Sequence, residues 1–201
     1  MLGAPRLATA SQETGVSRAQ IGLITGPVGV GKTTVAERVV SLARRLGLVC
    51  GGLLAPAIKD SHGEKTGIWG VDIRSGERRV LGMVRTHRDL GGPAIGPYSF
   101  DAEALAWAVI VIESAMQAAA LRPCDLVVVD EIGKLELWQG VGLAPILPRL
   151  AAGEAARSLV VVRDSLLAEL TARLGAIEPI VFEVSQENRA DLPPRILECL
   201  T

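Results

Sequence analysis

Residues 23–40, LITGPVGVGKTTVAERVV, join a short apolar run to a helical pattern through a turn made mostly of glycine, and the fold class can be inferred from this stretch. The apolar run stops at Thr25, as a buried strand would, and the residues from Thr33 onward place apolar side chains on one helical face. Between them, residues 26–33 match the pattern GxxxxGK[ST]. A strand, a glycine-rich turn and a helix in this order predict a loop that wraps around phosphate.

The residue types of this loop suit an anion. Glycines let main-chain N–H groups approach a phosphate closely, and the following helix adds the partial positive charge of its N-terminus. We expect Lys32 to reach the β- and γ-phosphates of a nucleotide and the Thr33 hydroxyl to ligate Mg²⁺. The residues expected to contact the nucleotide here are Gly26, Pro27, Val28, Gly29, Val30, Gly31, Lys32, Thr33 and Thr34.

A second signal is the apolar run at residues 126–129, which ends in the acids Asp130 and Glu131. In such a pair the first acid holds Mg²⁺, usually through water, and the second is positioned as a general base or to orient water. Two acids at a strand end are, alone, more often solvated charges. Because α/β folds bind ligands at the carboxyl edge of the sheet, where the phosphate loop also lies, we favour the functional interpretation.

Apolar runs and helical segments alternate along the chain, which predicts an α/β fold whose mostly parallel sheet is covered on both faces. The helix expected at 101–121 is apolar nearly all round, so we expect it to be buried. We expect a flexible N-terminal arm over residues 1–19 and a single domain over 20–201. The expected strands are 21–25, 48–56, 124–133, 158–163 and 179–185, the other helices are 33–47, 143–152, 164–174 and 192–200, a β-hairpin spans 66–82 as an edge elaboration, and 86–100 is a loop.

Composition excludes several classes of protein. The net charge of −1 gives no reason to expect nucleic-acid binding. The longest uncharged apolar run, residues 104–112, is too short to span a bilayer, and the first residues lack the apolar core of a signal peptide. The scattered cysteines, Cys50, Cys124 and Cys199, predict buried reduced thiols, so we expect a soluble, cytoplasmic protein.

The segments GPVGVGKTT and VVVDEIGKLEL are similar to those of the nucleoside-triphosphatase family of the THEP type, also called cancer-related NTPases. The resemblance extends to GGLLAP, GEKTGIWGVDIRSGERRVLG, IGPYSFDAEAL and VSQENRADLPPRIL, so it covers roughly residues 20–200. DEIGKLEL is far more specific to this group than the phosphate loop is. One departure lies at residues 51–53: the family often has Gly-Phe there with a Glu soon after, whereas this chain has Gly-Gly-Leu.

The resemblance implies a three-layer, RecA-like P-loop NTPase fold and slow, Mg²⁺-dependent hydrolysis of several nucleoside triphosphates, ATP and GTP among them. It gives Lys32 and Thr33 the phosphate and metal roles, Asp130 the metal role and Glu131 the catalytic role.

Weaker signals concern the γ-phosphate and the base. Gly133 stands three residues after Asp130, the spacing at which a GTPase N–H contacts the γ-phosphate. Asn188 and Arg189 follow a strand, in a segment that resembles the base-reading NKxD pattern as closely as it resembles a helix cap. We expect both to lie near the base, without a preference for guanine.

Catalysis also needs a cation for the charge that develops on the γ-phosphate. Arg163 ends the run LVVVR and is our candidate, although an ion pair with a neighbouring acid explains it equally well. Lys134, Arg85 and Arg88 are weaker candidates.

Three functions remain open from the sequence. The first is hydrolysis by a water molecule that Glu131 orients. The second is a small-molecule or nucleotide kinase, and the third is a nucleotide-gated switch acting with a protein partner that the sequence does not identify.

Overall fold

The computed structural model describes residues 19–117 and 123–200, so most of the predicted N-terminal arm lies outside the described residues. The strands are β1 (Gln20–Thr25), β2 (Cys50–Leu54), β3 (Ala57–Lys59), β4 (Lys65–Asp72), β5 (Arg78–Val84), β6 (Ala94–Ile95), β7 (Tyr98–Phe100), β8 (Leu126–Ile132), β9 (Arg157–Val162) and β10 (Ile180–Glu183). The helices are α1 (Lys32–Arg45), α2 (Ala102–Met116), α3 (Lys134–Gln139), α4 (Ile146–Ala151), the 3₁₀ turn η1 (Asp164–Leu166), α5 (Leu167–Arg173) and α6 (Leu192–Leu200).

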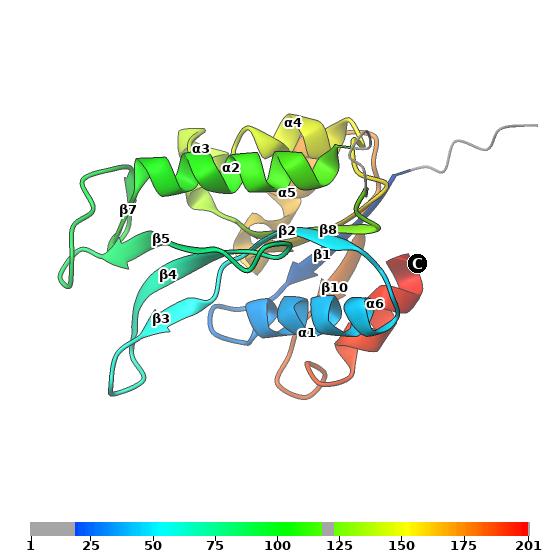
Figure 1. Cartoon of the computed structure of the whole chain (residues 1–201), viewed down its shortest axis with the longest axis horizontal. Helices are drawn as coiled ribbons and strands as arrows, with labels where there is room; N and C mark the ends of the chain where they lie inside the picture. The colour runs from blue at the N-terminus through cyan, green and yellow to red at the C-terminus, as the bar shows by residue number, and fades with distance from the viewer. Residues whose placement is uncertain (1–18, 118–122, 201) are drawn as a thin grey trace, which may run out of the picture.

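One sheet contains all ten of these strands and has two parts. Five parallel strands run in the order β10-β1-β9-β8-β2. The sheet continues from β2 through β4, β5, β7 and β6, which pair antiparallel, and β3 pairs with β4. We call residues 57–100, which hold β3 to β7, the antiparallel extension. It projects on the side of the molecule where the loop between β1 and α1 lies (Figure 1).

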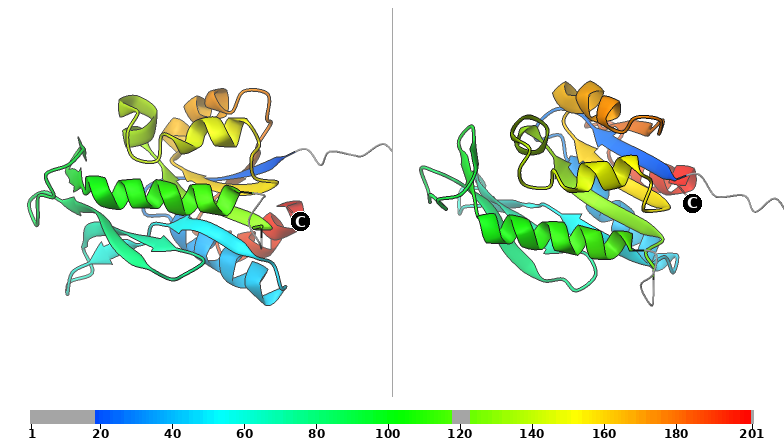
Figure 2. Two further views of the ribbon diagram at one scale, coloured as in Figure 1. Left: turned by 45° about the horizontal axis from the view of Figure 1, so that its top comes forward. Right: turned by 90° about the horizontal axis from the view of Figure 1, so that it is seen from above.

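Helices cover both faces of the parallel strands, as Figure 2 shows. Alternate residues of β1 illustrate why: Ile21 and Leu23 pack into the apolar cluster beneath α2, α4 and α5, whereas Ile24 packs into the cluster beneath α1 and α6. Side chains of a strand point alternately to the two faces, so an apolar strand needs a partner layer on each side. The predicted α/β fold with a mostly parallel central sheet is therefore confirmed.

The extension was predicted only in part. The hairpin expected at 66–82 is β4 and β5, and it lies beside β2 as an addition to the parallel strands. The interpretation of residues 86–100 as a loop is wrong, since this segment contains β6 and β7. Strand β3 and helix α3 were not predicted. Their three and six residues are too short to establish a hydrophobic period.

Two burial expectations are also wrong. Helix α2 buries only part of its apolar surface. Ile110, on its outer face, is 61% exposed. All three cysteines are free, but Cys199 is exposed and only Cys50 is fully buried. In the described residues, none of the helices is long and apolar enough to cross a membrane.

Candidate phosphate-binding site

The loop at residues 26–31 leaves the carboxyl end of β1 and enters α1 in a conformation that requires glycine. Gly26 and Gly31 have φ values of 141° and 107°, which residues with a side chain rarely adopt. A Cβ atom on Gly26 would lie 2.8 Å from the carbonyl oxygen of Val184. Because α1 begins directly at Lys32, the loop is followed by a helix N-terminus, whose partial positive charge favours an anion.

Lys32 bends back over this loop. Its ammonium donates to the carbonyl oxygens of Gly26 at 2.8 Å and Pro27 at 2.9 Å, and the residue is only 7% exposed. Burial lowers the pKa of Lys32, and the negative charge of Glu131 acts in the opposite direction. Lys32 therefore lies within electrostatic reach of the acids that end β8.

Asp130 is the buried member of the acidic pair. It is 1% exposed, and its two carboxylate oxygens accept hydrogen bonds from the Thr33 hydroxyl at 3.3 Å and the Ala55 N–H at 3.0 Å. Burial raises the pKa of Asp130 from 3.8 to about 7, although both hydrogen bonds act to lower it. The bond from Thr33 joins the first turn of α1 to the end of β8, so the phosphate loop and the acids meet at one edge.

The hydroxyl of Thr33 and the carboxylate of Asp130 fit the chemistry of a magnesium site. Both are oxygen donors, the type of ligand that Mg²⁺ prefers, and a divalent cation would stabilise the ionised form of a carboxyl whose burial favours protonation. Among the residues that the structure describes, no group of three or more His, Cys, Asp or Glu side chains could hold a metal. Few protein ligands suit Mg²⁺, because it usually completes its shell with water and phosphate oxygens.

Glu131 faces a different environment from its neighbour. Its carboxylate pairs with the guanidinium of Arg163, with 2.8 Å between Oε1 and Nε, and both side chains are partly exposed. Arg163 follows β9, which lies between β1 and β8 in the sheet although it comes later in the chain. This strand order brings Arg163 between the phosphate loop and the acidic pair.

The main-chain N–H of Gly133 has an acceptor within the protein. It donates to the Glu136 carboxylate at 2.8 Å, and the other oxygen of that carboxylate accepts from the N–H of Leu143 at 3.2 Å. Burial raises the pKa of Glu136, and both N–H groups oppose this effect. Sequence analysis missed this buried acid: it bonds back to the N-cap N–H as the Glu of a capping box does, but the N-cap is glycine, so the usual Ser or Thr signal is absent. A phosphate would have to displace it to reach the Gly133 N–H.

The segment after β10 also packs against the loop, but its two candidate residues differ. The Asn188 side chain is occupied by the main chain: its oxygen accepts from the Ser185 N–H at 2.8 Å, and its amide donates to the Glu183 carbonyl at 2.9 Å. Arg189 instead approaches Gly31, where an added Cβ would lie 3.7 Å from the guanidinium. A cavity of about 220 Å³ here is lined by Gly31, Thr34, Val35, Arg38 and Arg189.

A glycine-rich loop before a helix, a buried lysine over it and an acidic strand end beside it define the P-loop class of nucleotide-binding proteins. Comparisons with known proteins agree. The chain resembles the crystal structure of THEP1 from Aquifex aeolicus, with a TM-score of 0.66, 21% identity and coverage of 90% of this chain and 99% of that one. It also resembles the solution structure of a human cancer-related nucleoside triphosphatase, with a TM-score of 0.67, 26% identity and coverage of 91% and 98%.

Sequence relatives place the chain more narrowly. A family model described as NTPase matches residues 22–197. The nucleoside-triphosphatase THEP1 of Methanopyrus kandleri is 31% identical over 178 residues, which are 88% of this chain and 92% of that protein. The protein of the same name from Methanosarcina barkeri is 31% identical over 177 residues, or 86% and 92% of the two chains. The chain belongs to this NTPase family.

Proposed function

We propose that this chain is a nucleoside triphosphatase that hydrolyses the γ-phosphate of ATP, GTP and other nucleoside triphosphates with Mg²⁺, with broad base tolerance and slow turnover. The observation that carries the proposal is the convergence of Lys32, the Thr33–Asp130 pair and the Glu131–Arg163 pair at one edge of the sheet. The names of the relatives support the same reaction.

Each group then has a role in the reaction. The loop amides and Lys32 neutralise the β- and γ-phosphates, and the substrate is held in place by the N-terminus of α1. Thr33 and Asp130 would hold Mg²⁺, which supplies charge neutralisation between the phosphates when it is bound. Gly133 is proposed to approach the γ-phosphate only after its N–H leaves Glu136.

Glu131 is the group proposed to act on water. A partly exposed carboxylate at the end of β8 can accept a proton from a water molecule as that water attacks the γ-phosphorus. The bond from phosphorus to the leaving nucleoside diphosphate breaks as the new bond forms. Arg163 orients Glu131 through their ion pair, and we propose that its charge also stabilises the transition state.

Base tolerance and slow turnover follow from the same contacts. The Asn188 side-chain amide is bonded to main-chain atoms, so it does not read the base. Arg189 remains near the base, and its guanidinium plane can stack on any base. Because Arg163 divides its charge between Glu131 and the γ-phosphate, turnover is expected at about 10⁻⁴ to 10⁻² s⁻¹, as for GTPases that no partner protein assists. We also propose a cytoplasmic location, because three free cysteines suit a reducing compartment.

The test is Mg²⁺-dependent phosphate release from each of the four ribonucleoside triphosphates by the wild type and Glu131→Gln. The variant should bind nucleotide as the wild type does and lose about 100-fold or more in turnover, the usual contribution of a general base. Glu198→Gln is the matched control, because this acid lies on the exposed face of α6 and should leave turnover unchanged.

Two results would contradict the proposal. Normal turnover by Glu131→Gln would remove the proposed base. Transfer of labelled γ-phosphate to an added small acceptor, in place of release as inorganic phosphate, would make the protein a kinase.

A further inference from the structure

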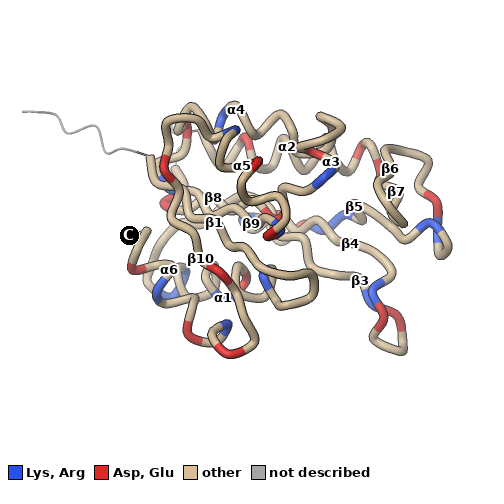
Figure 3. The backbone as a smooth tube through the Cα atoms, turned by 180° about the vertical axis from the view of Figure 1, so that it is seen from behind, with Lys and Arg blue, Asp and Glu red and all other residues tan. Residues whose placement is uncertain are grey.

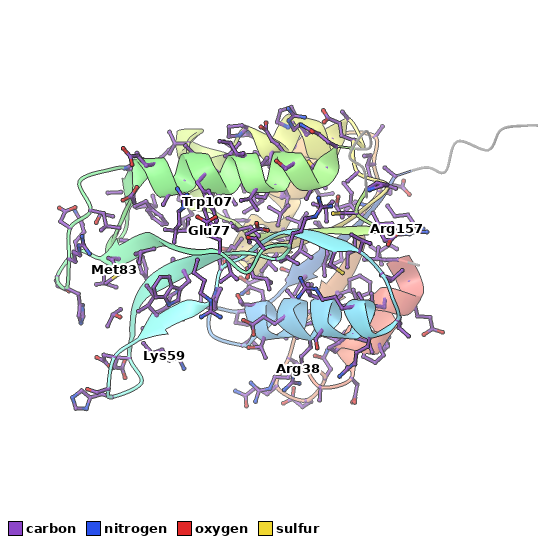
Figure 4. All side chains as sticks on the ribbon, viewed as in Figure 1. Arg38, Lys59, Glu77, Met83, Trp107 and Arg157 are labelled. Carbon is purple, nitrogen blue, oxygen red and sulfur yellow. The ribbon has the colours of Figure 1, made fainter. Side chains whose placement is uncertain are left out.

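The cavity of about 220 Å³ beside the phosphate loop has walls from two distant parts of the chain. One wall is the outer face of α1, where Thr34 and Arg38 are four residues apart and so lie on the same side of the helix. The other wall is Arg189, in the segment between β10 and α6. Because α1 and α6 share one apolar cluster, the two walls are held against each other. Arg38 is labelled on α1 in Figure 4.

The position of this cavity indicates what part of a ligand it receives. Gly31, the last residue of the phosphate loop, lines it together with Thr34 in the first turn of α1. The atoms Cδ and Nη1 of Arg189 lie 3.7 Å from the place that a Cβ atom on Gly31 would take. The loop amides and Lys32 are assigned to the phosphates, so the group that the phosphates carry lies next to them, in this cavity.

The chemistry of the cavity suits the flat face of a ring. Among the described residues that line it there is no Asp, Glu, Asn or Gln, so it offers no carboxylate or amide to the edge of a base. It has two guanidinium groups, and within residues 19–117 and 123–200 neither makes a hydrogen bond or an ion pair. Guanidinium planes stack on the faces of bases, and a base between two like charges interacts favourably with both.

We propose that Arg38 is a nucleoside-binding residue, and that the base of the bound nucleotide lies in this cavity between the guanidinium groups of Arg38 and Arg189. The inference rests on the proposed function for the identity of the ligand. It adds a residue from the middle of α1 to which sequence analysis assigns no role. It also has a specific consequence: Arg38 separates nucleotides from inorganic polyphosphate, because only nucleotides have a base, and it does so whichever base they have.

A second cavity provides the matched control. It has a volume of about 340 Å³, and Arg38 lines it together with Arg45, which follows about two helical turns later. Arg45 is exposed, as Arg38 is, and its side chain also makes no hydrogen bond or ion pair with the described residues. It does not line the cavity beside the phosphate loop. A loss of affinity that came only from the removal of a positive charge on α1 would therefore appear at both arginines.

The experiment measures dissociation constants with Mg²⁺ for the wild type, Arg38→Met and Arg45→Met in the full chain. The probes are the β,γ-imido analogues of ATP and GTP, which resist hydrolysis, and inorganic tripolyphosphate, which has no nucleoside. Arg38→Met should weaken both analogues about 5- to 50-fold, the size of a stacking contact with a base, and leave tripolyphosphate within about 2-fold. Arg45→Met should change none of these affinities. Thermal unfolding of each variant verifies that the fold is retained.

Arg38→Lys distinguishes stacking from charge. Lysine keeps the positive charge but lacks the guanidinium plane, so this variant should bind both analogues at least about 3-fold more weakly than the wild type.

Equal losses for tripolyphosphate and the analogues would overturn the proposal, because Arg38 would then act on phosphate. Equal behaviour of Arg38→Met and Arg45→Met, or full affinity in Arg38→Lys, would also overturn it. Phosphate release from ATP is measured separately, so this failure differs from failure of the proposed function. A wild type that hydrolyses ATP, with an Arg38→Met variant of unchanged affinity, would reject only the contact. A wild type that releases no phosphate, with a selective loss in Arg38→Met, would reject only hydrolysis.

Discussion

The parallel strands and the antiparallel extension contribute to the candidate site in different ways. Strands β1, β9 and β8 are neighbours that all point the same way, so the groups that follow them meet at one edge without any further device. In the extension, successive strands run in opposite directions, so the residues that follow neighbouring strands lie at opposite edges of the sheet. A parallel sheet therefore collects functional groups at one edge through its topology, whereas an antiparallel one does not.

The two regions also differ in how their charges are held. Asp130 and Lys32 are buried and hydrogen-bonded to the protein, which positions them before any ligand arrives. Many charged residues of the extension lie at its turns, as Figure 3 shows. Changes in the parallel part should therefore affect both binding and turnover, whereas changes in the extension should affect stability.

The largest effect is expected at Lys32. Lys32→Ala removes the buried ammonium that acts on two phosphates, so the affinity for a nucleoside triphosphate should fall about 100-fold or more, and turnover should fall with it. Isothermal titration and phosphate release measure the two quantities. Lys59→Ala in the extension should change neither, and a nucleotide affinity that survives Lys32→Ala would show that the ligand binds elsewhere.

Asp130→Asn should lower activity and raise stability. Without Mg²⁺, the pKa of Asp130 is about 7 in the folded protein against 3.8 for an ordinary aspartate, so the folded state holds a proton that the unfolded chain has released. The wild type then loses stability as pH rises from roughly 4 to 7, by up to about 4 kcal/mol. The substituted asparagine cannot ionise, and its amide can accept from the Ala55 N–H and donate to the Thr33 hydroxyl.

Denaturant unfolding with a chelator, at pH values from 5 to 8, measures this difference. The stability advantage of Asp130→Asn over the wild type should grow with pH and level off above about pH 7. An advantage that stays constant between pH 5 and 8 would mean that Asp130 is already ionised in the folded protein.

The smallest effect is expected where the extension contacts α2. The guanidinium of Arg79 lies 4.9 Å from the centre of the Trp107 ring and pairs with Glu77 at 2.8 Å, and Figure 4 shows Trp107 and Glu77 between α2 and the strands. Arg79→Gln should cost about 0.5–1 kcal/mol of stability, the usual value of an exposed cation–π contact. Nucleotide affinity should not change. A loss of affinity would show that the position of the whole extension is coupled to the site.

Sequence reasoning succeeded where the signal is local. The phosphate loop lies within nine consecutive residues between a strand and a helix, and Asp130 and Glu131 directly follow an apolar run. It missed Glu136, because the bonds of this acid to the N–H groups of Gly133 and Leu143 depend on how the short helix α3 and the segment after it fold. Strands β6 and β7 lie in a segment rich in glycine and proline, whose turn signals outweigh two or three strand residues.

The cations that the sequence suggested for the γ-phosphate show the same limit of sequence reasoning. Lys134 follows the acidic pair in the sequence, but its ammonium lies 4.6 Å from the centre of the Trp138 ring. Arg85 donates to the carbonyl of Gly96 within the extension. Lys134 and Arg85 became candidates because of their positions in the sequence. Which cations lie near Glu131 and Asp130 depends instead on how the chain packs.

Lys32, Thr33, Asp130 and Glu131 are proposed to surround one phosphate site, and the decisive test is a crystal structure with Mg²⁺ and a non-hydrolysable nucleoside triphosphate. We expect the β- and γ-phosphates to lie between the amides of residues 26–34 and Lys32, with the metal beside Thr33 and Asp130 and the γ-phosphate facing Glu131. A triphosphate bound away from the loop, or with its γ-phosphate directed away from β8, would contradict this proposal.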